Sequence, residues 1–167
     1  SSRCPTQRST RVTSPAYLPA LQSLGRLYFI KGRWEDLIAM HRQEIEVTLN
    51  EDQQIALLYK IGELYEEKLV QEDKAIVAYQ EVLRIQKTNF PAMKALIRIF
   101  TNKRDYESLI EIYEIESSIL EDPQQKSLSL FRVAEIYENN LSQPDKAIES
   151  LQAILQTAPQ HVPTLRS

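Results

Sequence analysis

The chain has 167 residues, of which 43% are hydrophobic and 26% charged, an ordinary composition for a globular protein. Its net charge of -3 argues against a general nucleic-acid-binding role, which needs clustered lysine and arginine. The single cysteine, Cys4, excludes an internal disulfide and a cysteine-based metal cluster. Every apolar run falls short of the roughly 18 to 20 residues of a membrane-spanning helix, so we expect no membrane insertion.

Residues 1–14 differ from the rest of the chain. They contain Arg3, Arg8 and Arg11 but no acidic residue, and they lack the apolar centre of a signal peptide. We expect a flexible tail, a linker or a segment foreign to the natural protein.

From Ala16 onward, apolar residues recur at steps of three and four, as in amphipathic helices. Asn50 and Asp122 each precede a glutamine by three residues, which is the spacing of a capping box and predicts two helix starts. Strand-like alternation is not sustained anywhere. The predicted helices are 16–30, 34–48, 51–68, 73–86, 90–102, 105–119, 123–140 and 145–157.

The chain repeats itself at a distance of 72 residues. Of the 78 positions from 18 to 95, 23 are identical to the residue 72 positions later. The sequence Asp-Lys-Ala-Ile, for example, occurs at 73–76 and again at 145–148. Each 72-residue stretch divides into two, because equivalent isoleucines open its second helices. These isoleucines are Ile38, Ile76, Ile110 and Ile148.

This division predicts four repeats and the start of another. We expect Ala75 and Ala147 to let helices approach closely, and Ile76 and Ile148 to fill the seam between hairpins. The chain is interpreted as a fragment of a longer array. The expected boundaries are about 18–50, 51–89, 90–122 and 123–160, with a truncated further repeat at 161–167.

These residues resemble the tetratricopeptide repeat, a helix-turn-helix of about 34 residues. The first repeat supplies Leu21, Leu24-Gly25 and Tyr28 at the family's apolar, Leu-Gly and aromatic positions. Ile97 stands where the family has a small residue, and Leu37 and Leu109 stand where it has alanine. We therefore expect looser packing in the first and third repeats.

The resemblance implies an all-α fold, a right-handed α-solenoid of antiparallel helix pairs with a concave inner surface. The alternation of short and long repeats is similar to that of large bacterial multi-repeat proteins of this family. That similarity implies a cytoplasmic location.

The resemblance also implies that the first helix of each pair lines a groove that binds a partner. The charges of Arg26, Glu63, Arg98 and Glu135 alternate along successive first helices, so they either pair with one another or remain available to a partner. Tyr59 and Phe131 either pack between helices or anchor a ligand. The candidate groove residues are Gln22, Arg26, Phe29, Tyr59, Glu63, Lys94, Arg98, Phe131 and Glu135.

The family's basic clamp on a terminal carboxylate is only partly present. Its places hold Gln22, Arg26 and Lys60, followed by Pro91 and Ala95, so binding of a chaperone tail is not expected.

No motif predicts catalysis. His41 and His161 lie far apart, neither is predicted to have a metal-ligating neighbour, and no glycine-rich phosphate loop occurs. We expect no enzyme activity, no cofactor and no metal.

Four hypotheses for function follow. The favoured one is a protein-interaction scaffold that binds a peptide or helix in its groove. The alternative is a structural or oligomerising spacer that self-associates through exposed solenoid ends. RNA binding is disfavoured by the acidic balance. A role in regulating an enzyme elsewhere on a longer chain is the fourth.

Overall fold

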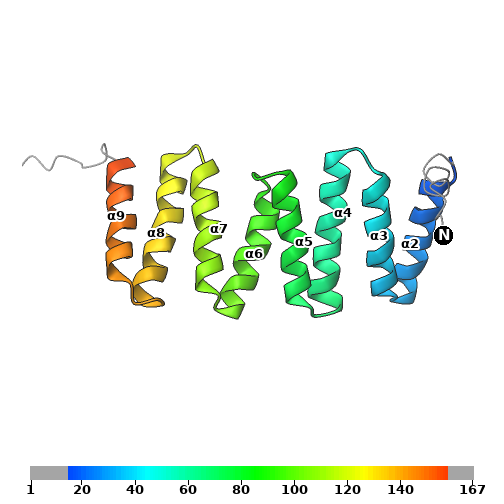
Figure 1. Ribbon diagram of the computed structural model, residues 1–167, viewed down its shortest axis with the longest axis horizontal. Helices are drawn as coiled ribbons and strands as arrows, with labels where there is room; N and C mark the ends of the chain where they lie inside the picture. Colours follow the sequence, from blue (N-terminus) through cyan, green and yellow to red (C-terminus); the bar gives the residue numbers. More distant parts are fainter. Residues whose placement is uncertain (1–14, 158–167) are drawn as a thin grey trace, which may run out of the picture. The chain divides into compact units, whose positions relative to one another are not determined.

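The computed structural model describes residues 15–157, which fall into two compact units, Ser1–Gln86 and Lys87–Ser167. We call them unit 1 and unit 2 and describe each by itself. Within the described residues the secondary structure is entirely helical, as predicted (Figure 1). The expected flexible segment at 1–14 and the truncated repeat at 161–167 lie outside the described residues.

Unit 1 consists of two helical hairpins. The first contains α2 (Tyr17–Lys31) and α3 (Trp34–Val47), and the second contains α4 (Glu51–Glu63) and α5 (Glu72–Ile85). Between α4 and α5, the helix continues as one π-helical turn, η1 (Leu64–Lys68), where the sequence predicted a plain helix to 68. This turn is closed by the Leu69 N–H, which donates to the Leu64 carbonyl at 3.1 Å.

Unit 2 repeats this arrangement. Its first hairpin contains α6 (Phe90–Lys103) and α7 (Tyr106–Ile119), and its second contains α8 (Pro123–Asn139) and α9 (Pro144–Thr157). Every predicted α-helix is present, and each begins within one residue of its predicted start. The all-α solenoid class predicted from the sequence is therefore confirmed.

Side-chain caps explain why several helices begin where they do. The Asn50 side chain accepts a hydrogen bond from the Gln53 N–H at 3.0 Å, as the capping spacing predicted. Asp122 caps α8 through the Gln124 N–H instead of the Gln125 N–H. Two caps that the sequence analysis missed, Asn89 on α6 and Asp105 on α7, act in the same way.

The turns repeat as faithfully as the helices. Gly32 and Arg104, which are 72 residues apart, both have left-handed backbone, with φ of 67° and 55°. Val70 and Ser142 form a second such pair, with φ of 53° and 52°. A left-handed conformation is costly for a β-branched side chain, so Val70 is the most strained residue of these four.

Small residues set the distance between helices within each hairpin. Ala75 and Ala147 are buried, and α4–α5 and α8–α9 approach each other more closely than α2–α3 and α6–α7. The looser hairpins are the two in which Leu37 and Leu109 occupy the alanine position, as the sequence predicted. In the second hairpin, Gly62 lies against the ring of Tyr79, where a Cβ would come within 2.6 Å of Cε1.

A salt bridge joins the two hairpins of unit 1. The Arg42 guanidinium of α3 donates two hydrogen bonds to the Glu81 carboxylate of α5, at 2.6 and 2.9 Å. The hydrogen bond to Glu81 is also the main cause that raises the Arg42 pKa above its ordinary value. Because this contact is bidentate, it fixes orientation as well as distance.

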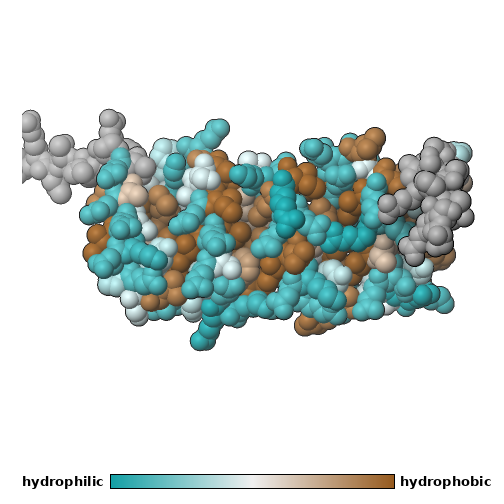
Figure 2. All heavy atoms as spheres, in the orientation of Figure 1, coloured by the Kyte–Doolittle hydropathy of each residue, from teal (hydrophilic) through white to brown (hydrophobic). Residues whose placement is uncertain are grey.

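One prediction about the seam is wrong. Ile148 is 51% exposed, whereas the equivalent Ile38 and Ile110 are each 5% exposed. Ile38 and Ile110 are each followed by another packed hairpin in their own unit, but no described helix follows α9. Figure 2 shows apolar side chains at the surface of α9 among hydrophilic ones.

Candidate functional site

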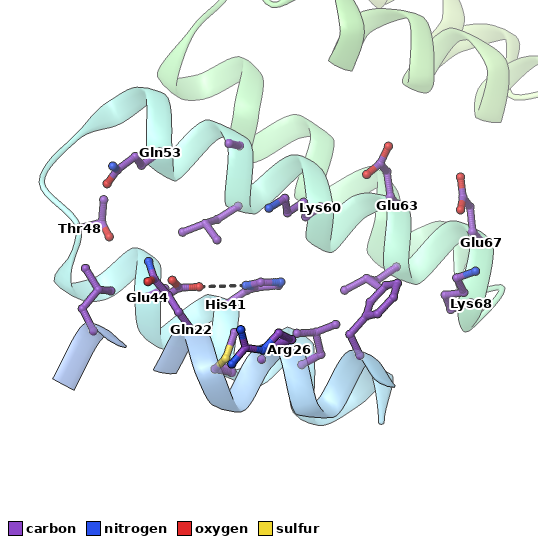
Figure 3. A pocket seen from close by; sticks show the side chains of 18 residues that line it. Gln22, Arg26, His41, Glu44, Thr48, Gln53, Lys60, Glu63, Glu67 and Lys68 are labelled. Atoms are coloured by element: carbon purple, nitrogen blue, oxygen red, sulfur yellow. Dashed lines mark hydrogen bonds and ion pairs between the residues drawn. The ribbon is translucent and has the colours of Figure 1, made fainter. Parts of the chain in front are cut away.

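A groove of about 780 Å³ opens in unit 1, lined by residues of α2, α3, α4 and η1 (Figure 3). We call it the unit 1 groove. Gln22 and Arg26 come from α2, Met40 and His41 from α3, and Lys60, Glu63 and Glu67 from α4 and η1. Its size lies within the range of ligand-binding clefts in proteins, about 300 to 1,000 Å³.

The groove depends on a glycine. Gly25 faces the end of the Met40 side chain, and a Cβ at position 25 would lie 2.6 Å from Met40 Sδ. The missing side chain lets the methionine lie against the backbone of α2. Met40 and Leu37 are buried behind the groove, so its inner surface includes apolar side chains.

Two cations face the middle of the groove without ion-pair partners. Arg26 comes from α2 and Lys60 from α4, and Figure 3 shows them on opposite sides of it. Neither forms an ion pair with another of the described residues. Both side chains are therefore available to a ligand.

One end of the groove is acidic. Glu63 and Glu67 lie there, on successive turns of the same helical segment (Figure 3). Burial raises the pKa of the Glu63 carboxyl, the charges of Glu67 and Glu66 raise it further, and Lys60 partly opposes them. Lys68, at the same end, has its ammonium group 5.6 Å from the centre of the Trp34 ring.

His41 and Glu44 form a pair inside the groove. His41 Nδ1 lies 3.1 Å from Glu44 Oε2, and the two side chains are 12% and 8% exposed. The sequence analysis assigned His41 no metal-ligating neighbour, which is wrong in that Glu44 contacts it one turn along the helix. Among the described residues, no group of three or more histidine, cysteine or acidic side chains has the arrangement of a metal site.

Four of the predicted groove residues line the unit 1 groove. These are Gln22, Arg26, Phe29 and Glu63. Tyr59 does not line it. Its ring packs against that of Tyr79, with centroids 5.2 Å apart, which supports the packing alternative over the anchoring one.

The remaining predicted residues belong to unit 2. Lys94 and Arg98 lie on exposed positions of α6, and Phe131 is 45% exposed on α8. Glu135 accepts a hydrogen bond from Arg132 Nη1 at 3.1 Å, so it pairs along its own helix.

Sequence reasoning did not place Met40, His41, Glu44 and Glu67 in the groove. Lys60 had been considered only as part of a carboxylate clamp. Its position three residues before Glu63 was the available signal, because residues one turn apart share a helix face.

The helical hairpins and their small-residue contacts agree with the comparison of the chain against protein families. Models of the tetratricopeptide repeat match residues 20–55, 56–85 and 128–161. The chain belongs to the tetratricopeptide repeat family. The matches cover the first, second and fourth predicted repeats, and α6 and α7 form the same kind of hairpin at the third.

Tetratricopeptide repeats are generally protein–protein interaction modules and are typically non-catalytic. No curated protein matches the chain. None of the helices within residues 15–157 combines the length and apolar character that crossing a membrane requires.

Proposed function

We propose that this tetratricopeptide repeat chain is a non-catalytic interaction scaffold that binds a peptide or helical segment of a partner protein in the unit 1 groove. The observation that carries the proposal is the groove itself, with an apolar interior and two cations without ion-pair partners at its middle. Ligand sites commonly combine an apolar lining with a few polar groups that fix orientation.

The proposal includes the four repeat boundaries given by the sequence, about 18–50, 51–89, 90–122 and 123–160. Lys94, Arg98 and Phe131 of unit 2 remain predicted contact residues, because their exposed positions leave them accessible to a partner.

The test is a selection of binders from a random peptide library displayed on phage, using the full 167-residue chain as bait. Selected peptides are then measured against a double variant, Gly25→Ile with Met40→Ile. This variant copies Ile97 and Ile112, the residues that unit 2 holds at the same positions.

We expect the double variant to lose peptide binding while its circular dichroism spectrum and cooperative melting are retained. An Arg84→Ala variant, on an exposed position of α5 away from the groove, is the matched control and should bind normally. Equal binding by wild type and the double variant would place the site elsewhere.

A second function, self-association, is favoured by apolar surface on the helices at the two ends of the described chain. Leu27 and Ile30 of α2 are exposed, as are Ile148 and Leu155 of α9. Stacked hairpins bury faces of this kind against a neighbour. Analytical ultracentrifugation over a range of concentrations tests this candidate, and a constant monomeric mass would exclude it.

A further inference from the structure

The charges in the unit 1 groove are ordered along its length. Because α2 and α4 are separated by one antiparallel helix, they run in the same direction, and their side chains can be compared level by level. Gln22 and Gln53 lie towards the helix starts, Arg26 and Lys60 in the middle, and Glu63 and Glu67 beyond (Figure 3). The sequence of levels is neutral, cationic and acidic.

The neutral end has little remaining demand for a charged ligand. Its polar residues are Gln22, Thr48 and Gln53, and the nearby carboxylate of Glu44 already contacts His41 at 3.1 Å. The residues that call for charged partners are therefore those of the middle and the acidic end.

The middle and the acidic end demand opposite charges. Arg26 and Lys60 form no ion pair with any of the described residues, so an anion of the ligand would complete them. Glu63 carries raised proton affinity because it is partly buried beside Glu66 and Glu67, so a cation would relieve that repulsion.

The spacing of these groups fits a short stretch of polypeptide. Lys60 and Glu63 differ by three residues of helix, or about 4.5 Å along its axis, and Glu67 lies about 6 Å further. Two residues of extended peptide span about 7 Å and one helical turn spans about 5.4 Å. Both conformations bring an acidic and a basic side chain to the two levels.

We propose that the occupant of the unit 1 groove is a bipolar peptide segment, with an acidic side chain between Arg26 and Lys60 and a basic side chain two to four residues away at Glu63 and Glu67. The inference rests on the proposed function, and it specifies the chemistry of the partner. A uniformly acidic segment would meet repulsion from Glu63 and Glu67, and a uniformly basic one would meet it from Arg26 and Lys60.

An exposed aromatic ring stands at the same level as the acidic residues. Phe29 lies one helical turn beyond Arg26 on α2 and is 57% exposed, with its ring packed edge-on against Trp34 at 5.5 Å between centroids. The bipolar segment therefore places its basic side chain near an aromatic face as well as near two carboxylates, an arrangement that favours cations.

The experiment uses the peptides selected from the random phage library. We expect enriched peptides to share one acidic and one basic residue separated by one to three others. Fluorescence anisotropy of a labelled enriched peptide should show affinity about fivefold weaker or more for Arg26→Glu and for Glu63→Lys. The Arg84→Glu control should bind as wild type does.

A reversed-charge variant sharpens the test. The triple change Arg26→Glu, Lys60→Glu and Glu63→Lys should prefer a peptide in which the acidic and basic residues are exchanged. Thermal melting of each variant shows whether it is folded, and Arg26→Gln provides a milder substitution at an exposed position.

The outcomes separate the inference from the proposed function. If peptides bind and the groove-filling double variant abolishes binding, but charge reversal changes nothing, the bipolar inference is wrong and the scaffold proposal stands. If no peptide is enriched, or if the double variant binds equally well, the groove is not the site and both fail.

Discussion

Units 1 and 2 follow the same 72-residue pattern, yet the positions that form the groove of unit 1 hold different residues in unit 2. Gly25 corresponds to Ile97, and His41 corresponds to Tyr113. Ile97 and Tyr113 are both half-buried, and burial is the main cause that raises the pKa of the Tyr113 hydroxyl. Side chains in unit 2 therefore occupy positions that are open or more polar in unit 1.

The buried acid at this position also has a different partner in each unit. Glu44 contacts His41, whereas the equivalent Glu116 accepts a hydrogen bond from Ser129 Oγ at 2.7 Å. The residues that repeat between the units, such as Leu37 and Leu109, build the hairpins. The residues that do not repeat shape the surface, so fold and binding properties can change independently.

The largest expected effect comes from filling the tighter of the two glycine contacts in unit 1. Gly62→Ile should lower the free energy of unfolding by about 3 kcal/mol, because the Tyr79 ring is fully buried and has little room to move. Gly25→Ile should cost less, since the obstructing atoms are the flexible end of Met40. Urea denaturation of both variants measures the difference, and equal losses would contradict it.

The alanine of the closer hairpins gives the next effect. Ala147→Leu, which copies the equivalent Leu109 of unit 2, should lower the free energy of unfolding by about 1 to 2 kcal/mol through overpacking against α8. Ala153→Leu, a less buried position on the same helix, serves as the control. An unchanged melting temperature for Ala147→Leu would mean that alanine does not set the closer approach.

The left-handed turn residues offer a smaller effect of opposite sign. Val70→Gly should raise the free energy of unfolding by about 0.5 to 1 kcal/mol, because glycine removes the clash of a β-branched side chain at positive φ. Ser142→Gly in unit 2 should gain less. Thermal denaturation of the two variants tests this order, and a loss of stability in Val70→Gly would refute it.

The smallest effect distinguishes the two glutamates that are 72 residues apart. The folded-state pKa of Glu63 is raised, so its charge destabilises the fold at neutral pH, and this penalty disappears as the pH falls through the raised pKa towards the unfolded value. Glu63→Gln should therefore stabilise the protein slightly at pH 7, by less than about 0.5 kcal/mol, and lose this advantage near pH 4.

Glu135→Gln is the matched comparison for this change. It removes the charged acceptor of Arg132 and should be neutral or slightly destabilising at pH 7. Melting curves at both pH values check the contrast. A larger stabilisation by Glu135→Gln than by Glu63→Gln would mean that the local charges do not act as the contacts indicate.

The helices could be predicted from the sequence because their signals are local. The apolar steps of three and four and the caps at Asn50 and Asp122 lie within a few residues of the boundaries that they set. The 72-residue repeat then gave two independent views of each hairpin, and both views agreed on the starts of the helices.

The groove could only partly be predicted, because it depends on contacts between residues distant in sequence. Arg26 and Glu63 were identified from their place in the repeat, but the contact of Gly25 with Met40 needed the packed structure. The π-helical turn at 64–68 was missed since Leu64 and Tyr65 satisfy the pattern of an ordinary helix. The exposure of Ile148 was missed because the pattern cannot show which seams lack a neighbour.

The bidentate contact between Arg42 and Glu81 has a consequence for how a partner docks. It ties α3 to α5, which belong to the hairpins on either side of the unit 1 groove. Spreading these hairpins would require both hydrogen bonds to break, so the width of the cleft is preset. Recognition should accordingly resemble the docking of two nearly rigid bodies, with side chains adjusting while the backbone stays in place.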